Sequence, residues 1–241
     1  MNGRVALVAG IGATLFAVAA AALSLRGPDP AYLPAFAARP WAGTSGDIYV
    51  AKYEVTVAEW NRCNDAGACS LRLKTRGGLD PATTPATGLN WLDTREYVAW
   101  INRRARHPLR LPTRREWNDM AASVLPPKPD PIFTDPALRW AADYLTDRDY
   151  PRALRPSGTF SESREGVFDL DGSVWEWTSE CYHENTLTEH CAAFWAGGLH
   201  LSVLSIFTRD PARGGCAVGA PPAHLGMRLV SDRAPPDWAQ R

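Results

Sequence analysis

The feature that most constrains the fold is the stretch of residues 166–178, where an apolar run breaks at an Asp-Gly pair and resumes with two tryptophans flanking a glutamate. This pattern predicts a strand, a tight turn and a second strand. Side chains alternate between the faces of a strand, so Trp175 and Trp177 should share a buried face while Glu176 lies on the other, beside free turn carbonyls. Such a carboxylate suits Ca²⁺. The alternative is a polar turn in which Glu176 bonds to nearby backbone.

Several further blocks stand in the same order as the motifs of a known family. They are Tyr53-Glu54-Val55-Thr56, Asn90-Trp91-Leu92-Asp93, Arg110-Leu111-Pro112-Thr113, Gly197-Gly198 and Leu225-Gly226-Met227-Arg228. With the Trp-Glu-Trp stretch, these blocks make residues 47–232 resemble the formylglycine-generating enzyme, or sulfatase-modifying factor, family. The resemblance implies a C-type-lectin-like α/β (α+β) fold with little regular structure.

The first 25 residues are typical of an export segment. Arg4 precedes a run over residues 5–25 that has no charge and is rich in Ala, Val and Leu. Small residues near its end would permit cleavage as a signal peptide, whereas about 20 apolar residues also suffice for a membrane anchor. Both alternatives stay open. Either one predicts a periplasmic or otherwise extracytoplasmic protein, in the second case anchored in the inner membrane.

The rest of the chain predicts one domain with one sizeable core, because 45% of the residues are hydrophobic and ten are tryptophans. Prolines and glycines without periodicity indicate a linker at residues 26–46, before the domain at 47–232 and a tail at 233–241. The chain has 26 basic and 26 acidic residues. This balance gives no electrostatic support for nucleic acid as a partner.

Three capping boxes predict helices that begin after Thr56, Asn90 and Thr113. The second helix should continue to about Pro108. The strands expected before the first and third helices are residues 47–55 and 109–111.

Five cysteines in an exported chain indicate disulfides, because that compartment is oxidising. Cys63 and Cys69 flank a turn-forming loop, and Cys181 and Cys191 flank a polar one. We therefore predict these two bridges, which leave Cys216 buried or free.

The second cysteine pair has an alternative role. Together with His183 and His190, the sulfurs of Cys181 and Cys191 form a donor set that would suit copper or zinc, whereas a bridged sulfur cannot bind as a thiolate. His200 follows the Gly-Gly block, where the resemblance places the active cleft, and is a further candidate residue. These three histidines carry the alternative hypothesis of a metal-dependent oxidoreductase with a non-standard site.

The resembling enzymes oxidise a substrate cysteine with O₂ and bind Cu(I) through two cysteines that follow the Gly-Gly block. Counting from that block in this chain places Ser202 at the first position and Phe207 at the second. Cu(I) selects soft thiolates, which a hydroxyl and a phenyl ring do not replace. The resemblance therefore implies that copper is not bound and that formylglycine-generating activity is absent.

The resemblance also implies a structural calcium site at the Trp-Glu-Trp turn. Its expected ligands are the side chain of Glu176 and the backbone carbonyls of Asp171, Gly172 and Val174. Ser173 stands where the family has asparagine.

The function that these observations favour is that of an exported, non-catalytic family member that serves as a binding or accessory protein through its cleft. The partner would be a protein or a small molecule. The chain is similar to the NirV type of exported bacterial members, which are encoded beside copper nitrite reductase. That similarity implies a link to denitrification, with nitrite reductase as a candidate partner.

Overall fold

The computed structural model describes residues 30–43, 46–125, 153–184, 186–209 and 223–235. The export segment, Cys216 and the end of the tail lie outside these ranges. Within them, no helix combines the length and the apolar character needed to cross a membrane.

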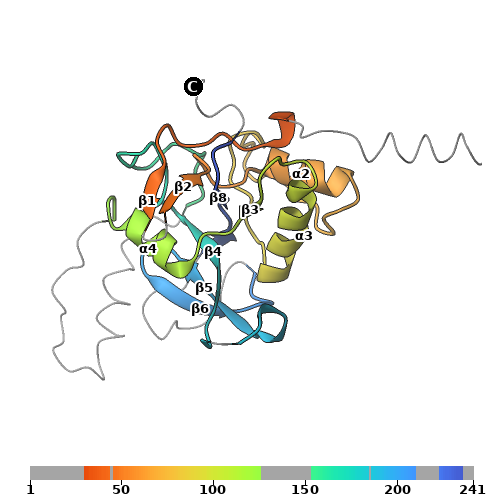
Figure 1. The fold of residues 1–241 in the computed structure, drawn as a ribbon. Helices are drawn as coiled ribbons and strands as arrows, with labels where there is room; N and C mark the ends of the chain where they lie inside the picture. Colours follow the sequence, from red (N-terminus) through yellow and green to blue (C-terminus); the bar gives the residue numbers. More distant parts are fainter. Residues whose placement is uncertain (1–29, 44–45, 126–152, 185, 210–222, 236–241) are drawn as a thin grey trace, which may run out of the picture.

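The described residues form a mixed α+β fold with two small sheets and few helices, as predicted (Figure 1). The first sheet has the order β1-β2-β8-β3 and only antiparallel pairs. Its strands are Trp41–Gly43, Gly46–Val50, Val230–Ser231 and Leu109–Arg110. The second sheet has the order β6-β5-β4-β7, with β4 and β7 parallel. Its strands are Leu201–Ser205, Ala193–Gly197, Val174–Cys181 and His224–Gly226.

All three predicted helices form, and each begins with the predicted capping box. They are α2 (Val57–Asp65), α3 (Trp91–Asn102) and α4 (Arg114–Ala121). The described residues also form the short 3₁₀ helices η1 (Pro30–Tyr32) and η3 (Thr188–His190). In each box the cap side chain accepts from the backbone of the acidic residue three positions on, whose carboxylate accepts in return. Helix α4 packs against β4 and β5, and α2 packs against α3.

Helix α3 is shorter than predicted, because it ends at Asn102 rather than near Pro108. The Asn102 side chain donates to the Leu109 carbonyl at 2.8 Å and accepts from the Leu109 amide at 2.7 Å. These two bonds imitate a strand partner and direct the chain into β3.

The strand predictions need two corrections. Strand β2 ends at Val50, and Val55 donates instead to the Met227 carbonyl outside the ladder. In the stretch at residues 166–178, only the second arm becomes a strand, β4. Phe168 of the first arm makes a single bridge to Glu162.

Four tryptophans of the described residues are fully buried: Trp60, Trp100 and Trp177 lie in one hydrophobic cluster, and Trp117 lies in a second. The Gly-Gly block fits between aromatic rings: a Cβ on Gly197 would lie 2.1 Å from the Trp117 ring, and one on Gly198 2.3 Å from the Trp175 ring. Glycine is therefore required at both positions.

Candidate functional site

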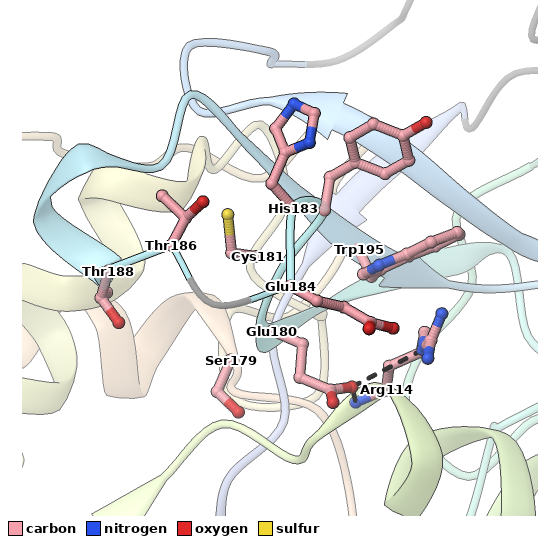
Figure 2. A pocket seen from close by; sticks show the side chains of 10 residues that line it. Arg114, Ser179, Glu180, Cys181, His183, Glu184, Thr186, Thr188 and Trp195 are labelled. Carbon is pink, nitrogen blue, oxygen red and sulfur yellow. Dashed lines mark hydrogen bonds and ion pairs between the residues drawn. The ribbon is translucent and has the colours of Figure 1, made fainter.

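A cavity of about 360 Å³ opens where β4 ends and the hairpin to β5 begins (Figure 2). Arg114 from the start of α4 and Trp195 from β5 line it on one side. The end of β4 and the hairpin supply the other lining residues, which are Ser179, Glu180, Cys181, Tyr182, His183, Glu184, Thr186 and Thr188. Its volume is in the range of small-ligand sites.

A disulfide ties the hairpin that forms the cavity wall. Cys181 is bonded to Cys191, and the second bridge joins Cys63 to Cys69 at the end of α2. Both predicted bridges are thereby confirmed. The sulfurs of Cys181 and Cys191 are not thiolates in this state, so they do not form the copper or zinc donor set that was the alternative.

Arg114 and Glu180 form the main polar contact of the cavity. The Glu180 carboxylate accepts from the Arg114 backbone amide at 2.6 Å and lies 3.7 Å from the Arg114 Nε atom. The Arg114 guanidinium also stands 4.8 Å from the Trp195 ring centroid. Arg114 is therefore held by a carboxylate and by an aromatic face.

The three candidate histidines do not converge. His183 lines the cavity, and His190 is exposed on η3. His200 is buried beyond β5, at the opposite end of β4, where its ring meets Trp175 edge-on at 4.7 Å. Among the residues that the structure describes, no three His, Cys, Asp or Glu side chains are grouped so that they could hold a metal ion.

The cleft expected at His200 is thus not where the described cavity lies. Sequence reasoning placed it by the Gly-Gly block, and it missed Arg114, Glu184 and Trp195 as lining residues. The available signal was the polar loop between two cysteines, because a short disulfide-tied loop at a strand end is a frequent place for a binding site.

The positions of the two family cysteines have opposite environments. Ser202 lies on β6 opposite Ala196 and is 1% exposed, whereas Phe207 follows β6 and is 69% exposed. All four cysteines in the described part of the chain are in disulfides.

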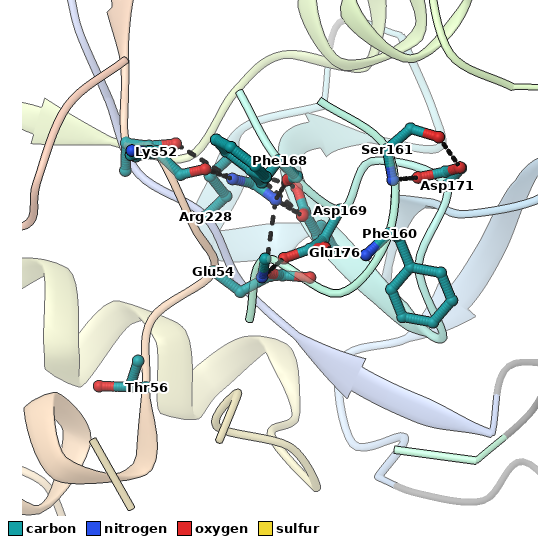
Figure 3. A network of polar contacts seen from close by, with 12 residues as sticks. Lys52, Glu54, Thr56, Phe160, Ser161, Phe168, Asp169, Asp171, Glu176 and Arg228 are labelled. Carbon is teal, nitrogen blue, oxygen red and sulfur yellow. Dashed lines mark hydrogen bonds and ion pairs between the residues drawn. The ribbon is translucent and has the colours of Figure 1, made fainter. Parts of the chain in front are cut away.

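A second polar cluster is buried in the centre of the molecule, around Arg228 and Glu176 (Figure 3). Arg228 donates from Nε to both Glu176 oxygens at 3.0 and 3.2 Å, and from a terminal nitrogen at 2.7 Å. Trp117 adds a bond from its indole nitrogen at 2.8 Å. Both carboxylate oxygens of Glu176 therefore already accept hydrogen bonds.

These contacts bear on the predicted calcium ligands. The face of β4 that lies opposite Trp175 and Trp177 is buried too. On this face, Glu176 contacts Arg228 and Trp117 rather than lying beside the turn carbonyls. The Asp171 side chain accepts from the amide and hydroxyl of Ser161 at 3.0 and 2.6 Å. A cation bound to Glu176 would compete with the Arg228 guanidinium. Calcium at this turn, bound by the Glu176 side chain and the carbonyls of Asp171, Gly172 and Val174, stays a prediction.

Arg228 also donates to three backbone carbonyls. Its two terminal nitrogens bond to Ala51, Lys52 and Phe168 at 3.0, 3.0 and 2.8 Å. The side chain thereby joins the end of β2, the first arm of the turn and β4. Its pKa is raised by the neighbouring carboxylates Glu176 and Glu54, against the opposing effect of burial.

Glu54 is the surplus carboxylate of this cluster. It is 2% exposed, and its Oε2 atom lies 3.6 Å from a terminal nitrogen of Arg228. Burial raises the pKa of Glu54 to about 8, with Arg228 opposing the rise and Glu176 and Asp169 adding to it. The sequence shows Glu54 only as part of a family block, because its pairing with Arg228 joins residues far apart in the chain.

The fold and the site together define a domain of the formylglycine-generating-enzyme-like class, with an α+β frame, a buried arginine–carboxylate centre and a cavity beside a disulfide-tied hairpin. The family model described as the sulfatase-modifying factor enzyme 1-like domain matches residues 42–233. The chain belongs to this family.

The fold is similar to that of several solved structures. PvdO from Pseudomonas aeruginosa is 16% identical with a TM-score of 0.55, and the match covers 83% of this chain and 93% of PvdO. CarF and Treponema denticola variable protein 1 are both 14% identical with TM-scores of 0.50. Their matches cover 78% of this chain and 87% and 85% of theirs, respectively. No curated protein matches the chain significantly.

Proposed function

We propose that this protein is an exported, non-catalytic member of the sulfatase-modifying factor family that serves as a binding or accessory protein. Its ligand site is the cavity between α4, β5 and the disulfide-tied hairpin. The observation that carries the proposal is the pair Ser202 and Phe207 at the family's copper positions, one buried and the other exposed. Neither side chain supplies the thiolate that Cu(I) selects.

The test is an assay for aldehyde formation. The purified protein is incubated with Cu(I), O₂ and a cysteine-containing sulfatase peptide, and the product is examined by mass spectrometry. We expect no formylglycine and no stoichiometric copper. Aldehyde formed by the unchanged protein would overturn the proposal and support the oxidoreductase hypothesis, with His200 as the first residue to substitute.

Export is supported by the charge-free segment at residues 5–25 and by the two disulfides, which persist in oxidising compartments. Cell fractionation should place the protein in the periplasm or the inner membrane. Sequencing the N-terminus of the mature protein then distinguishes a cleaved signal peptide from an anchor. Recovery in the cytoplasm would contradict this part of the proposal.

The proposed partner is nitrite reductase, and the support for it is the similarity of the chain to the NirV type. An accessory role predicts direct binding between the purified proteins. Isothermal titration of the protein into copper nitrite reductase from the same organism measures it. If the titration shows no heat of binding and the two proteins do not co-elute in gel filtration, nitrite reductase is not the partner. The binding role would then belong to other ligands.

A further inference from the structure

Two glutamates, Glu180 and Glu184, line the cavity together with one arginine, Arg114, which pairs with only one of them. Arg114 is paired with Glu180 at 3.7 Å and through the backbone bond. Glu184 makes no ion pair or hydrogen bond with the described residues, and it is exposed in the cavity wall. Figure 2 shows the Glu184 carboxylate directed into the space beside Trp195 and Arg114. An anionic ligand would meet two carboxylates and one arginine that is already paired.

Two aromatic rings line the same cavity as this carboxylate. The ring centroids of Tyr182 and Trp195 are 5.9 Å apart, and the rings are tilted by 56°. Trp195 already receives the guanidinium of Arg114 at 4.8 Å, so a cation is accepted at this ring within the protein itself. Aromatic faces attract ammonium and guanidinium groups, and a nearby carboxylate strengthens that attraction.

The hairpin beside the cavity also exposes apolar surface. Tyr182 is 49% exposed and Leu187 is 63% exposed. Leu187 sits between the lining residues Thr186 and Thr188. A cation carried on an apolar stem would pair its charge with Glu184 and cover these side chains with its stem.

From these features we infer that the cavity binds an organic cation, an ammonium or guanidinium group on an apolar stem, between Glu184 and the rings of Tyr182 and Trp195. This inference rests on the proposed binding function and names the ligand class of the same site. The cation has two sources with the same chemistry: a free amine, or a Lys or Arg side chain of a partner protein.

Ligand-observed NMR titration of the purified, disulfide-bonded protein tests the inference. The probes are n-butylammonium and agmatine as free cations, N-acetyl-lysine amide and N-acetyl-arginine amide as blocked residues, and N-acetyl-norleucine amide as a neutral match for the lysine stem. We expect the cations to bind, norleucine not to bind, and added salt to weaken binding. If the free cations bind as tightly as the blocked residues, the source is a free amine. If only the blocked residues bind, the source is a partner's side chain.

Glu184→Gln removes the charge and keeps the shape, so it should weaken cation binding by about fivefold, as for a solvated ion pair. Glu189→Gln is the matched control, because Glu189 is exposed on η3 in the same hairpin but does not line the cavity. Tyr182→Leu should weaken binding while the fold is kept.

The inference is overturned if Glu184→Gln binds the cations as well as the unchanged protein does, if norleucine binds equally, or if no cation binds at millimolar concentration. The aldehyde assay decides the proposed function separately. A protein that makes no aldehyde and binds no cation would keep the non-catalytic assignment and lose only this ligand class.

Discussion

At Glu54 the protein buries a carboxylate beside an arginine that already has a better partner. Glu176 holds Arg228 with bonds of 2.7 to 3.2 Å, whereas Glu54 is 3.6 Å away. Burial of the charged form is costly without full compensation, which is why the pKa of Glu54 rises to about 8. The folded protein therefore keeps a proton on Glu54 that the unfolded chain has lost above its ordinary pKa.

This proton makes stability depend on pH in a defined direction. The folded pKa is raised above the unfolded value of 4.5, so the contribution of Glu54 is fully present below pH 4.5 and is lost as pH rises toward about 8. Glu54→Gln stays neutral at every pH and should remove this loss, which amounts to up to ~1.4 kcal/mol per pH unit. Urea unfolding from pH 5 to 8 measures it.

In that experiment the variant should gain stability relative to the unchanged protein as pH rises. Glu184→Gln is the control, since it makes the same substitution at an exposed glutamate outside the buried cluster. Parallel profiles for Glu54→Gln and the unchanged protein would show that Glu54 titrates normally in the fold.

For the helices and strands, the sequence predicts those features that depend on contacts between neighbouring residues. The capping boxes at Thr56, Asn90 and Thr113 act within four residues, so the sequence alone places the helix starts. The end of α3 depends on the side chain of Asn102 reaching Leu109, which no local pattern shows.

The ion centre and the cavity depend on longer-range contacts. Glu176 meets an arginine 52 residues further along the chain. Alternation correctly separates this glutamate from the tryptophans, but it does not reveal that the opposite face of β4 is buried as well. The cavity likewise forms only when the start of α4 lies against the hairpin. The sequence therefore predicted the hairpin disulfide but not the cavity.

The hairpin disulfide should matter to binding as well as to stability. Cys181 and Cys191 are ten residues apart. Removing the bridge from a loop of this length raises the entropy of the unfolded chain, which destabilises the fold by about 2–3 kcal/mol. Cys181→Ser/Cys191→Ser should therefore lower the free energy of unfolding by about that amount and weaken cation binding in the cavity. Chemical denaturation and the NMR titration measure the two effects.

Cys63→Ser/Cys69→Ser is a matched control, because its loop spans six residues and gives a comparable entropy change away from the cavity. It should cost similar stability and leave cation binding intact. If both double variants bound equally well, the hairpin bridge would have no part in shaping the site.

For the whole molecule, the buried ion centre is the point at which distant segments meet. Arg228 bonds to the end of β2, to Phe168 and to Glu176, and Trp117 brings α4 to the same carboxylate. The centre therefore joins both sheets and one helix. A change here should lower the stability of the entire domain in one cooperative transition rather than loosen one loop.

Glu176→Gln tests this centre and the calcium prediction together. It keeps the shape of the side chain and an acceptor for Trp117, but it leaves the buried Arg228 without its main counter-charge, which costs about 3–5 kcal/mol. If Glu176 serves only the ion pair, which occupies both carboxylate oxygens, the loss of unfolding free energy should be the same with calcium and with chelator. A calcium ion held by Glu176 would instead stabilise only the unchanged protein, by mass action on the folded state. Denaturation of both proteins in both buffers separates the two outcomes: a calcium-dependent gain in the unchanged protein that Glu176→Gln abolishes would assign Glu176 to a metal site.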